Sequence, residues 1–182
     1  MKRWLVTFAL ALMAAAGQVV FAQTIVPQGS EIRFVSRQLG VPVEGHFTIW
    51  RADIAFDPKS PAAGRVAFTI DTGSARLGNA ETDGEVRKPA WFDVAKFPQA
   101  RFQSTAIKAV RPGHYEVAGM LTIKGQSREV IVPVALDDSI ASGSFTIKRL
   151  QFRIGDGEWA DTSMVADEVV VTFKLRLAGL TG

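Results

Sequence analysis

The sequence contains no cysteine, and this single absence removes several kinds of chemistry. Disulfides, thiolate metal sites and a cysteine nucleophile are all excluded, although an oxidising compartment is not. Histidine is scarce as well. His46 and His114 have no second histidine and no carboxylate at ligand spacing beside them, so each is interpreted as a surface or rim histidine.

Motifs that carry catalysis are also missing. The sequence has no G-x-S-x-G nucleophile elbow, and its GDG run at residues 155–157 lacks the lysine and the strand-to-helix context of a phosphate loop. Asp156, Glu158, Asp161 and Asp167 make the surrounding loop acidic, and we favour a solvated loop there over a cation site. The sequence therefore predicts no catalytic residues and no metal ligands, and it argues against an enzyme.

Residues 1–22 have the pattern of a signal peptide. Lys2 and Arg3 form a basic start, residues 4–16 are almost unbroken apolar sequence, and Ala22 closes a segment suited to signal peptidase. The alternative is an uncleaved anchor over residues 4–22, whose 19 residues are of borderline length. We expect cleavage before Gln23, and hence a periplasmic or secreted protein.

The positive charge of the chain belongs largely to this segment. The chain has 21 basic and 18 acidic residues, and Lys2 and Arg3 leave with the signal, so 19 basic residues face 18 acidic ones in the mature chain. A net charge of about +1 gives no reason to expect nucleic-acid binding.

Alternation of apolar and polar residues dominates residues 23–182, which show no repeat, linker or low-complexity tract. The pattern predicts one all-β domain of about eight strands, and closure into an up-and-down antiparallel barrel would remove exposed edges. A barrel of this size is filled by side chains or holds one slender ligand, and both alternatives stay open here. The expected strands cover residues 30–38, 43–57, 65–72, 101–110, 114–123, 127–137, 142–150 and 168–177.

One stretch, residues 82–104, interrupts this alternation. Its charged run at residues 83–88 predicts a short solvent-facing helix, which Pro89 ends. Trp91 and Phe92 follow, and such large aromatic residues in a polar connection need a surface to pack on. We predict that the stretch closes one end of the barrel, with Trp91 and Phe92 as its lid.

The inward face of each strand follows from the same alternation, although a shift of one residue would reverse it. Two residues mark irregular places in the strands. Gly45, inside a long strand, predicts a bulge or sharp bend, and Pro133 predicts an edge or a locally unpaired position. The residues predicted to line the lumen are Phe34, Phe47, Phe68, Ile70, Phe102, Leu121, Ile123, Phe145, Val171 and Phe173.

Several short motifs, in this order and spacing, resemble the polyisoprenoid-binding YceI-like family of bacterial periplasmic proteins. They are SEIRF at residues 30–34, VEGHF at 43–47, WFD at 91–93, GMLTIKG at 119–125 and VADEV at 165–169. The resemblance covers residues 30–177. It implies a lipocalin-like antiparallel barrel of eight strands, with a short helical insertion between the third and fourth.

The resemblance also implies a non-enzymatic carrier of an isoprenoid lipid, such as a quinone or a polyprenyl phosphate, with no other cofactor. The alternative is an interaction protein that docks on a membrane b-type cytochrome or another redox partner. A homodimer is compatible with the sequence but not demanded by it. Gln38 replaces a histidine common in the family, and residues 82–86 depart from the family pattern, so head-group preference is expected to differ there.

Overall fold

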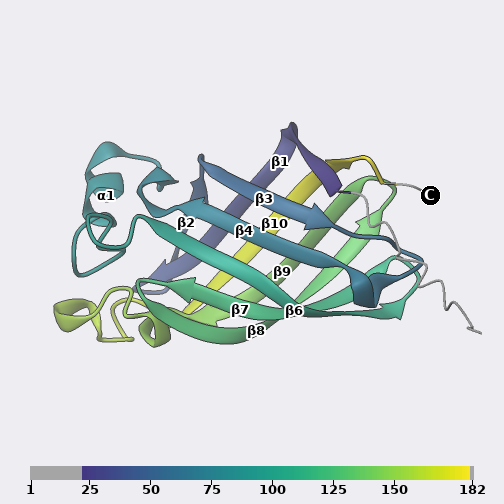
Figure 1. Ribbon diagram of the computed structural model, residues 1–182. Helices are drawn as coiled ribbons and strands as arrows, with labels where there is room; N and C mark the ends of the chain where they lie inside the picture. The colour runs from purple at the N-terminus through teal and green to yellow at the C-terminus, as the bar shows by residue number, and fades with distance from the viewer. Residues whose placement is uncertain (1–21, 181–182) are drawn as a thin grey trace, which may run out of the picture.

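The computed structural model describes residues 22–180, so all of the predicted signal segment except Ala22 lies outside the described residues. Short 3₁₀ turns at Pro61–Ala63, Thr72–Ser74, Arg149–Phe152 and Gly157–Trp159 punctuate a chain that is mostly strand (Figure 1). The strands and the helix are β1 (Ala22–Gln38), β2 (Val41–Phe47), β3 (Trp50–Ala55), β4 (Arg65–Asp71), β5 (Ala75–Arg76), α1 (Ala80–Glu85), β6 (Gln99–Arg111), β7 (His114–Ile123), β8 (Gln126–Asp137), β9 (Ile140–Lys148) and β10 (Glu168–Ala178).

The strands form one closed antiparallel barrel. Hydrogen-bonded neighbours run β10-β9-β8-β7-β6-β4-β3-β1, and β10 pairs again with β1 to close the ring. β2 and β3 are the two halves of one bent strand, and the two residues of β5 extend β4 in the same way. The predicted eight-stranded barrel is thus confirmed, with α1 inserted between its third and fourth strands.

The bend between β2 and β3 lies at Thr48 and Ile49, and Ser74 holds it. The Thr48 amide donates to the Ser74 carbonyl at 3.2 Å, and the Ile49 amide donates to the Ser74 hydroxyl at 3.1 Å. A glycine inside a long strand commonly marks a bulge. Gly45 does not, because its register with Phe34 runs unbroken from Ile32 to Gln38.

β1 begins at Ala22, eight residues before the predicted start. Its pairing with β10 reaches Val26 opposite Arg176 and resumes at Glu31 opposite Lys174, so the four residues between Val26 and Glu31 loop outward. The Ser30 hydroxyl donates to the Val26 carbonyl at 2.6 Å and accepts from the Arg176 amide at 2.8 Å. This excursion is visible as the peak in β1 at the top of Figure 1.

β8 and β9 pair over only part of their length. Their ladder runs from Val134 opposite Gly143 to Asp137 opposite Ile140, while residues 126–133 of β8 and 144–148 of β9 do not pair with each other. Pro133 stands at the end of the ladder. The sequence prediction that Pro133 occupies a locally unpaired position is therefore confirmed.

The helix of the insertion begins earlier than predicted. α1 spans Ala80–Glu85 rather than residues 83–88, because the Asn79 side chain caps it by accepting from the Thr82 amide at 2.8 Å. Val86 then turns inward and is buried. No helix within residues 22–180 is long and apolar enough to cross a membrane.

Candidate ligand cavity and its caps

The inward faces of the strands enclose an apolar cavity of about 150 Å³. Twenty residues of the described chain line it, and the Tyr115 hydroxyl is the one polar group that their side chains carry. No charged side chain of residues 22–180 reaches the lining. Because an unpaired polar group in such a site is costly, the cavity suits a ligand part that needs no hydrogen bond.

Seven of the ten residues predicted to line the lumen do line this cavity. They are half-buried or buried. The seven are Phe68, Ile70, Phe102, Leu121, Phe145, Val171 and Phe173. Their contact with a ligand stays a prediction.

The other three lie toward the cap end. Ile123 is buried beside Ala100 and Phe152, in one hydrophobic cluster with them. Phe34 packs on Phe47 with ring centroids 5.2 Å apart, and Phe47 packs on Phe92 at 6.1 Å. The three residues are inward-facing, as predicted, but they are not among the residues that line the cavity.

The far half of the cavity is lined by residues outside the predicted set. Phe56 and Tyr115 meet there edge to face at a centroid distance of 4.9 Å, and Leu136, Leu175 and Leu177 complete that half. The same strand alternation that identified the other seven also marks these residues. They were missed because the sequence does not say how far along each strand an open space extends.

Three glycines let phenylalanine rings lie against the barrel wall, and at Gly119 and Gly143 these rings border the cavity. A Cβ on Gly45 would lie 2.3 Å from the Phe34 ring, and one on Gly119 would lie 2.5 Å from the Phe102 ring. On Gly143 it would lie 2.6 Å from the Phe173 ring. Each ring therefore lies flat against the backbone of a neighbouring strand instead of crossing the lumen, a way of covering strand glycines with aromatic rings.

The insertion and the segment after β9 together close one end of the barrel, at the left of Figure 1. The Ala90 carbonyl joins them, accepting from the Gly155 amide at 2.8 Å and the Asp156 amide at 3.1 Å. Trp91 packs on Trp159 with centroids 5.5 Å apart. The predicted lid residues Trp91 and Phe92 thus lie over the cap end, and their role as a lid stays a prediction.

Lys124 ties a third segment to this cap. It forms a two-residue turn with Gly125 between β7 and β8, and both have positive φ, 48° and 72°. Its ammonium donates to the Arg153 carbonyl at 2.6 Å and to the Ala90 carbonyl at 3.3 Å, and lies 3.6 Å from Asp156. Asparagine and glycine favour such turns, so a lysine here indicates that its side chain is needed for the cap.

Arg149 organises the segment that follows β9, which the sequence analysis interpreted as a solvated loop. Only 1% of its surface is exposed. Its guanidinium donates five hydrogen bonds of 2.5–3.0 Å, all to backbone carbonyls, those of Ile154, Gly155, Trp159, Val165 and Ala166. Burial lowers the pKa of Arg149, and the negative charge of Asp167 partly offsets this.

The position of Arg149 shows why sequence reasoning missed it. The expected strand 142–150 included this residue, whereas β9 ends at Lys148 and Arg149 begins a 3₁₀ turn. Gly155 was the one sequence signal of this packing, because a glycine can mark a place where large side chains approach the backbone closely. A Cβ at this position would lie 2.5 Å from the Arg149 guanidinium and 2.9 Å from Trp91. Only glycine fits between these two large side chains.

Two groups in the cap have no hydrogen-bond partner within residues 22–180, the indole nitrogens of Trp91 and Trp159. Among residues 22–180, no three His, Asp or Glu side chains are grouped as they would be to hold a metal ion.

A closed antiparallel barrel with an apolar interior cavity and a capped end is a lipocalin-like barrel. The chain belongs to the YceI-like domain family, whose sequence model matches residues 23–177. A UPF0312 protein of Yersinia pestis (strain Pestoides F) is 35% identical over 134 residues, which make up 71% of this chain and 67% of the relative.

Solved structures show the same barrel. BcnA of Burkholderia cenocepacia is 41% identical, with a TM-score of 0.79 over 85% of this chain and 99% of that one. A polyisoprenoid binding domain from Saccharophagus degradans is 18% identical, with a TM-score of 0.66 over 85% and 97% of the two chains. The second likeness, at this low identity, concerns the fold alone.

Proposed function

We propose that the protein is a non-enzymatic binding protein for an isoprenoid lipid, such as a quinone or a polyprenyl phosphate, and that it carries this lipid in the periplasm. The observation that carries the proposal is the apolar cavity, whose lining offers a tail nothing but apolar side chains and one hydroxyl. The similar barrel described as polyisoprenoid-binding makes isoprenoids the first ligands to test.

Binding would be driven by removal of the tail from water. Each Å² of buried apolar surface contributes roughly 25 cal/mol, so an isoprenoid tail gains several kcal/mol without polar recognition. No nucleophile, base or bound group is needed for this, in keeping with the missing catalytic motifs. The specificity of such a lumen rests on length and shape.

The volume of the cavity sets a condition on this proposal. A cavity of about 150 Å³ accommodates one benzene-sized group, whereas a tail of several isoprene units is larger. The lumen must therefore widen to take such a tail. The phenylalanine rings that lie on Gly119 and Gly143 and the unpaired stretch between β8 and β9 are where we expect this widening.

The direct test is to purify the protein from the periplasm of its native host, extract it with organic solvent and identify the extract by mass spectrometry. We expect a polyprenyl species in about one-to-one ratio with a chain that begins at Gln23. Repeated extraction without any lipid would overturn the carrier proposal. A chain that retains residues 1–22 would overturn cleavage before Gln23 and favour the uncleaved anchor.

One observation favours a second candidate, docking on a membrane partner such as a b-type cytochrome. Leu39, Val41 and Met164 are exposed by 69%, 63% and 43%, and the Leu39 amide donates to the Met164 carbonyl at 2.8 Å. Such an exposed apolar group is a common feature of interaction sites. In the extraction experiment, this candidate predicts a co-purifying membrane protein that Leu39→Asp removes.

A further inference from the structure

The barrel wall is open between β1 and the bent strand β2–β3. β1 pairs with β3 only at Ala22 and Gln23, and its pairing with β2 starts again at Ile32 opposite Phe47. Between these points, residues 24–31 and 48–53 are not paired with each other. The outward excursion of β1 and the bend at Thr48 pull the two strands apart at the same height.

A groove of about 690 Å³ occupies this opening, and we call it the β1–β3 groove. Twelve residues of these strands line it, and they fall into an outward-facing rim and an inward-facing floor. The lining residues are Thr24, Ile25, Pro27, Ser30, Glu31, Arg33, His46, Phe47, Thr48, Trp50, Arg51 and Ala52.

The floor of the groove is one layer of side chains away from the lumen. Ile25 is the register partner of Leu177, and Trp50 is that of Ile70; Leu177 and Ile70 both line the apolar cavity. The Trp50 ring also packs on the ring of Phe68, another cavity residue, with centroids 6.3 Å apart. Rotation of Ile25 and Trp50 would therefore connect the groove to the cavity.

The rim of the groove is cationic. Arg33 lies 3.5 Å from Glu31, but both are more than half exposed, at 56% and 52%, so this pair is weak. The Arg51 side chain is exposed and makes no hydrogen bond or ion pair with another residue of the described chain. A guanidinium without a partner beside an open groove is available to an anion.

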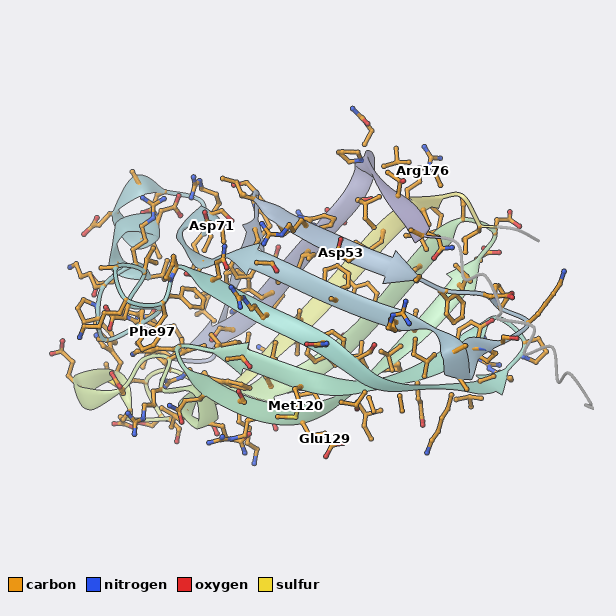
Figure 2. All side chains as sticks on the ribbon, viewed as in Figure 1. Asp53, Asp71, Phe97, Met120, Glu129 and Arg176 are labelled. Atoms are coloured by element: carbon orange, nitrogen blue, oxygen red, sulfur yellow. The ribbon has the colours of Figure 1, made fainter. Side chains whose placement is uncertain are left out.

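Charges on the neighbouring strands strengthen this field. Lys174 is the register partner of Glu31, and Arg176 is that of Val26, both on β10. Asp53 follows two residues after Arg51 on the same face; Figure 2 labels Asp53 and Arg176 at this wall. Four cationic side chains thus stand against two carboxylates here, although residues 23–182 as a whole carry a charge of only about +1.

The two buried cations of the cap, Arg149 and Lys124, do not offer the same opportunity. The Arg149 guanidinium donates hydrogen bonds to five backbone carbonyls. The Lys124 ammonium donates to two further backbone carbonyls and forms an ion pair with Asp156. Both are at least 93% buried, since 1% and 7% of their surfaces are exposed. An anion that approached Arg149 or Lys124 would have to displace these bonds, whereas one at the β1–β3 groove meets the exposed side chain of Arg51.

We propose that the β1–β3 groove binds the phosphate or diphosphate head group of an anionic lipid, whose tail passes between Ile25 and Trp50 into the lumen. This deepens the proposed function and rests on it. Arg51 and Arg33 present planar donors that suit phosphate oxygens, and a head group at the rim keeps much of its hydration. The wall, rather than either end of the barrel, is the route of the tail.

The test compares geranylgeranyl diphosphate with geranylgeraniol, which has the same tail and no charge. We expect the purified protein to bind the diphosphate at least tenfold more tightly at low salt, and this preference to shrink at 0.5 M salt because exposed charges are screened. The combined variant Arg33→Gln/Arg51→Gln should lose the preference while binding the alcohol unchanged. Lys108→Gln/Arg111→Gln, which removes two charges on β6, is the matched control.

Three other outcomes would each overturn a stated part of the proposal. If Arg33→Gln/Arg51→Gln keeps the wild-type preference, the head group does not bind in the groove. If inorganic diphosphate alone binds as tightly as the prenyl form, the groove is a site for a free anion and the lipid proposal is wrong. If neither geranylgeranyl compound binds, the proposed carrier function itself fails.

The route of the tail has a separate test, which the absence of cysteine makes simple. Thr24→Cys places a unique thiol in the groove lining, and a bulky thiol reagent there should slow uptake of both geranylgeranyl compounds at least fivefold. The same reagent on Ile131→Cys, at an exposed site of β8, should leave uptake unchanged. Unaltered uptake of the alcohol by labelled Thr24→Cys would show that the tail enters elsewhere.

Discussion

Arg149 is the residue that most constrains the cap. Its contribution to stability follows from the number of backbone carbonyls to which it donates hydrogen bonds. Each buried carbonyl left without a donor costs about 1–3 kcal/mol, so loss of the guanidinium affects several such groups at once. We expect Arg149→Met to lower the free energy of unfolding by more than about 3 kcal/mol, measured by urea denaturation.

Lys148→Met, at the exposed neighbouring position, is the control for Arg149→Met and should change the free energy of unfolding by less than about 0.5 kcal/mol. Arg149→Lys should recover a part of the loss, because one ammonium can replace only some of the five bonds. Equal stability of the Met variant and the wild type would contradict the role assigned to Arg149.

The contact between Phe34 and Gly45 makes a second prediction at this scale. The three atoms nearest to a Cβ on Gly45 all belong to the Phe34 ring, whereas one on Gly119 or Gly143 also meets a backbone carbonyl, at 2.5 Å and 2.3 Å. Gly45→Ala should therefore cost about 1–3 kcal/mol by overpacking, and Phe34→Ala should remove most of this penalty. A double-mutant cycle measures the coupling, which additive effects of the two substitutions would refute.

Residue by residue, the sequence was informative where one rule decides the outcome. Alternation placed Phe68, Phe102 and Phe173 on inward faces, and the structure has them there. It failed where a long-range partner decides. Gly45 looked like a bulge because its partner Phe34 lies in another strand, and Arg149 looked like part of a strand because the carbonyls it binds belong to a segment without periodicity.

At the scale of elements, the eight strands and the place of the insertion followed from the sequence, because turns and alternation are local signals. The interruptions in strand pairing did not follow from the sequence. The excursion in β1 depends on Ser30 meeting both Val26 and Arg176, and the bend before β3 depends on Ser74. These contacts join distant segments, so no single window of sequence contains them.

The unpaired stretch between β8 and β9 predicts uneven hydrogen exchange. Residues 144–148 pair with β10 on one side only, so alternate amides that point toward β8 have no carbonyl partner there. These amides should exchange much faster than those of β10 between Val171 and Leu175, as residue-resolved exchange by NMR would show. Uniform protection along β9 would contradict an opening in this wall.

On the scale of the whole molecule, the cavity is a compromise between stability and binding. A fully packed barrel would be more stable, since voids forfeit packing contacts. The cavity remains because Gly119 and Gly143 let the rings of Phe102 and Phe173 lie against the wall. Sequence alone could not decide between a filled and an open lumen, because the difference depends on where each ring lies and not on which residues face inward.

Phe145 offers a test of this compromise, since it lines the cavity and lies beside the unpaired stretch of β9. Phe145→Ala enlarges the lumen and should cost about 3–5 kcal/mol of stability in the lipid-free protein. A long isoprenoid fills the new space, so geranylgeraniol should stabilise the variant more than the wild type. When the ligand concentration is one hundred times the Kd, ligand binding raises the free energy of unfolding by about 2.7 kcal/mol. If the variant binds geranylgeraniol more tightly than the wild type, its free energy of unfolding rises by more than that of the wild type at the same ligand concentration.

Urea denaturation with and without geranylgeraniol measures both quantities, and Ile131→Ala, at an exposed position of β8, is the control that should respond to the ligand as the wild type does. If the ligand stabilises Phe145→Ala no more than the wild type, the tail does not occupy the space that Phe145 borders. The tail would then have to lie away from Phe145, beside Ile54, Leu175 and Leu177, in the one core cluster that Phe145 does not pack against. The response of Phe145→Ala to geranylgeraniol, set against the wild type and Ile131→Ala, therefore decides whether the tail lies beside Phe145 or beside Ile54, Leu175 and Leu177.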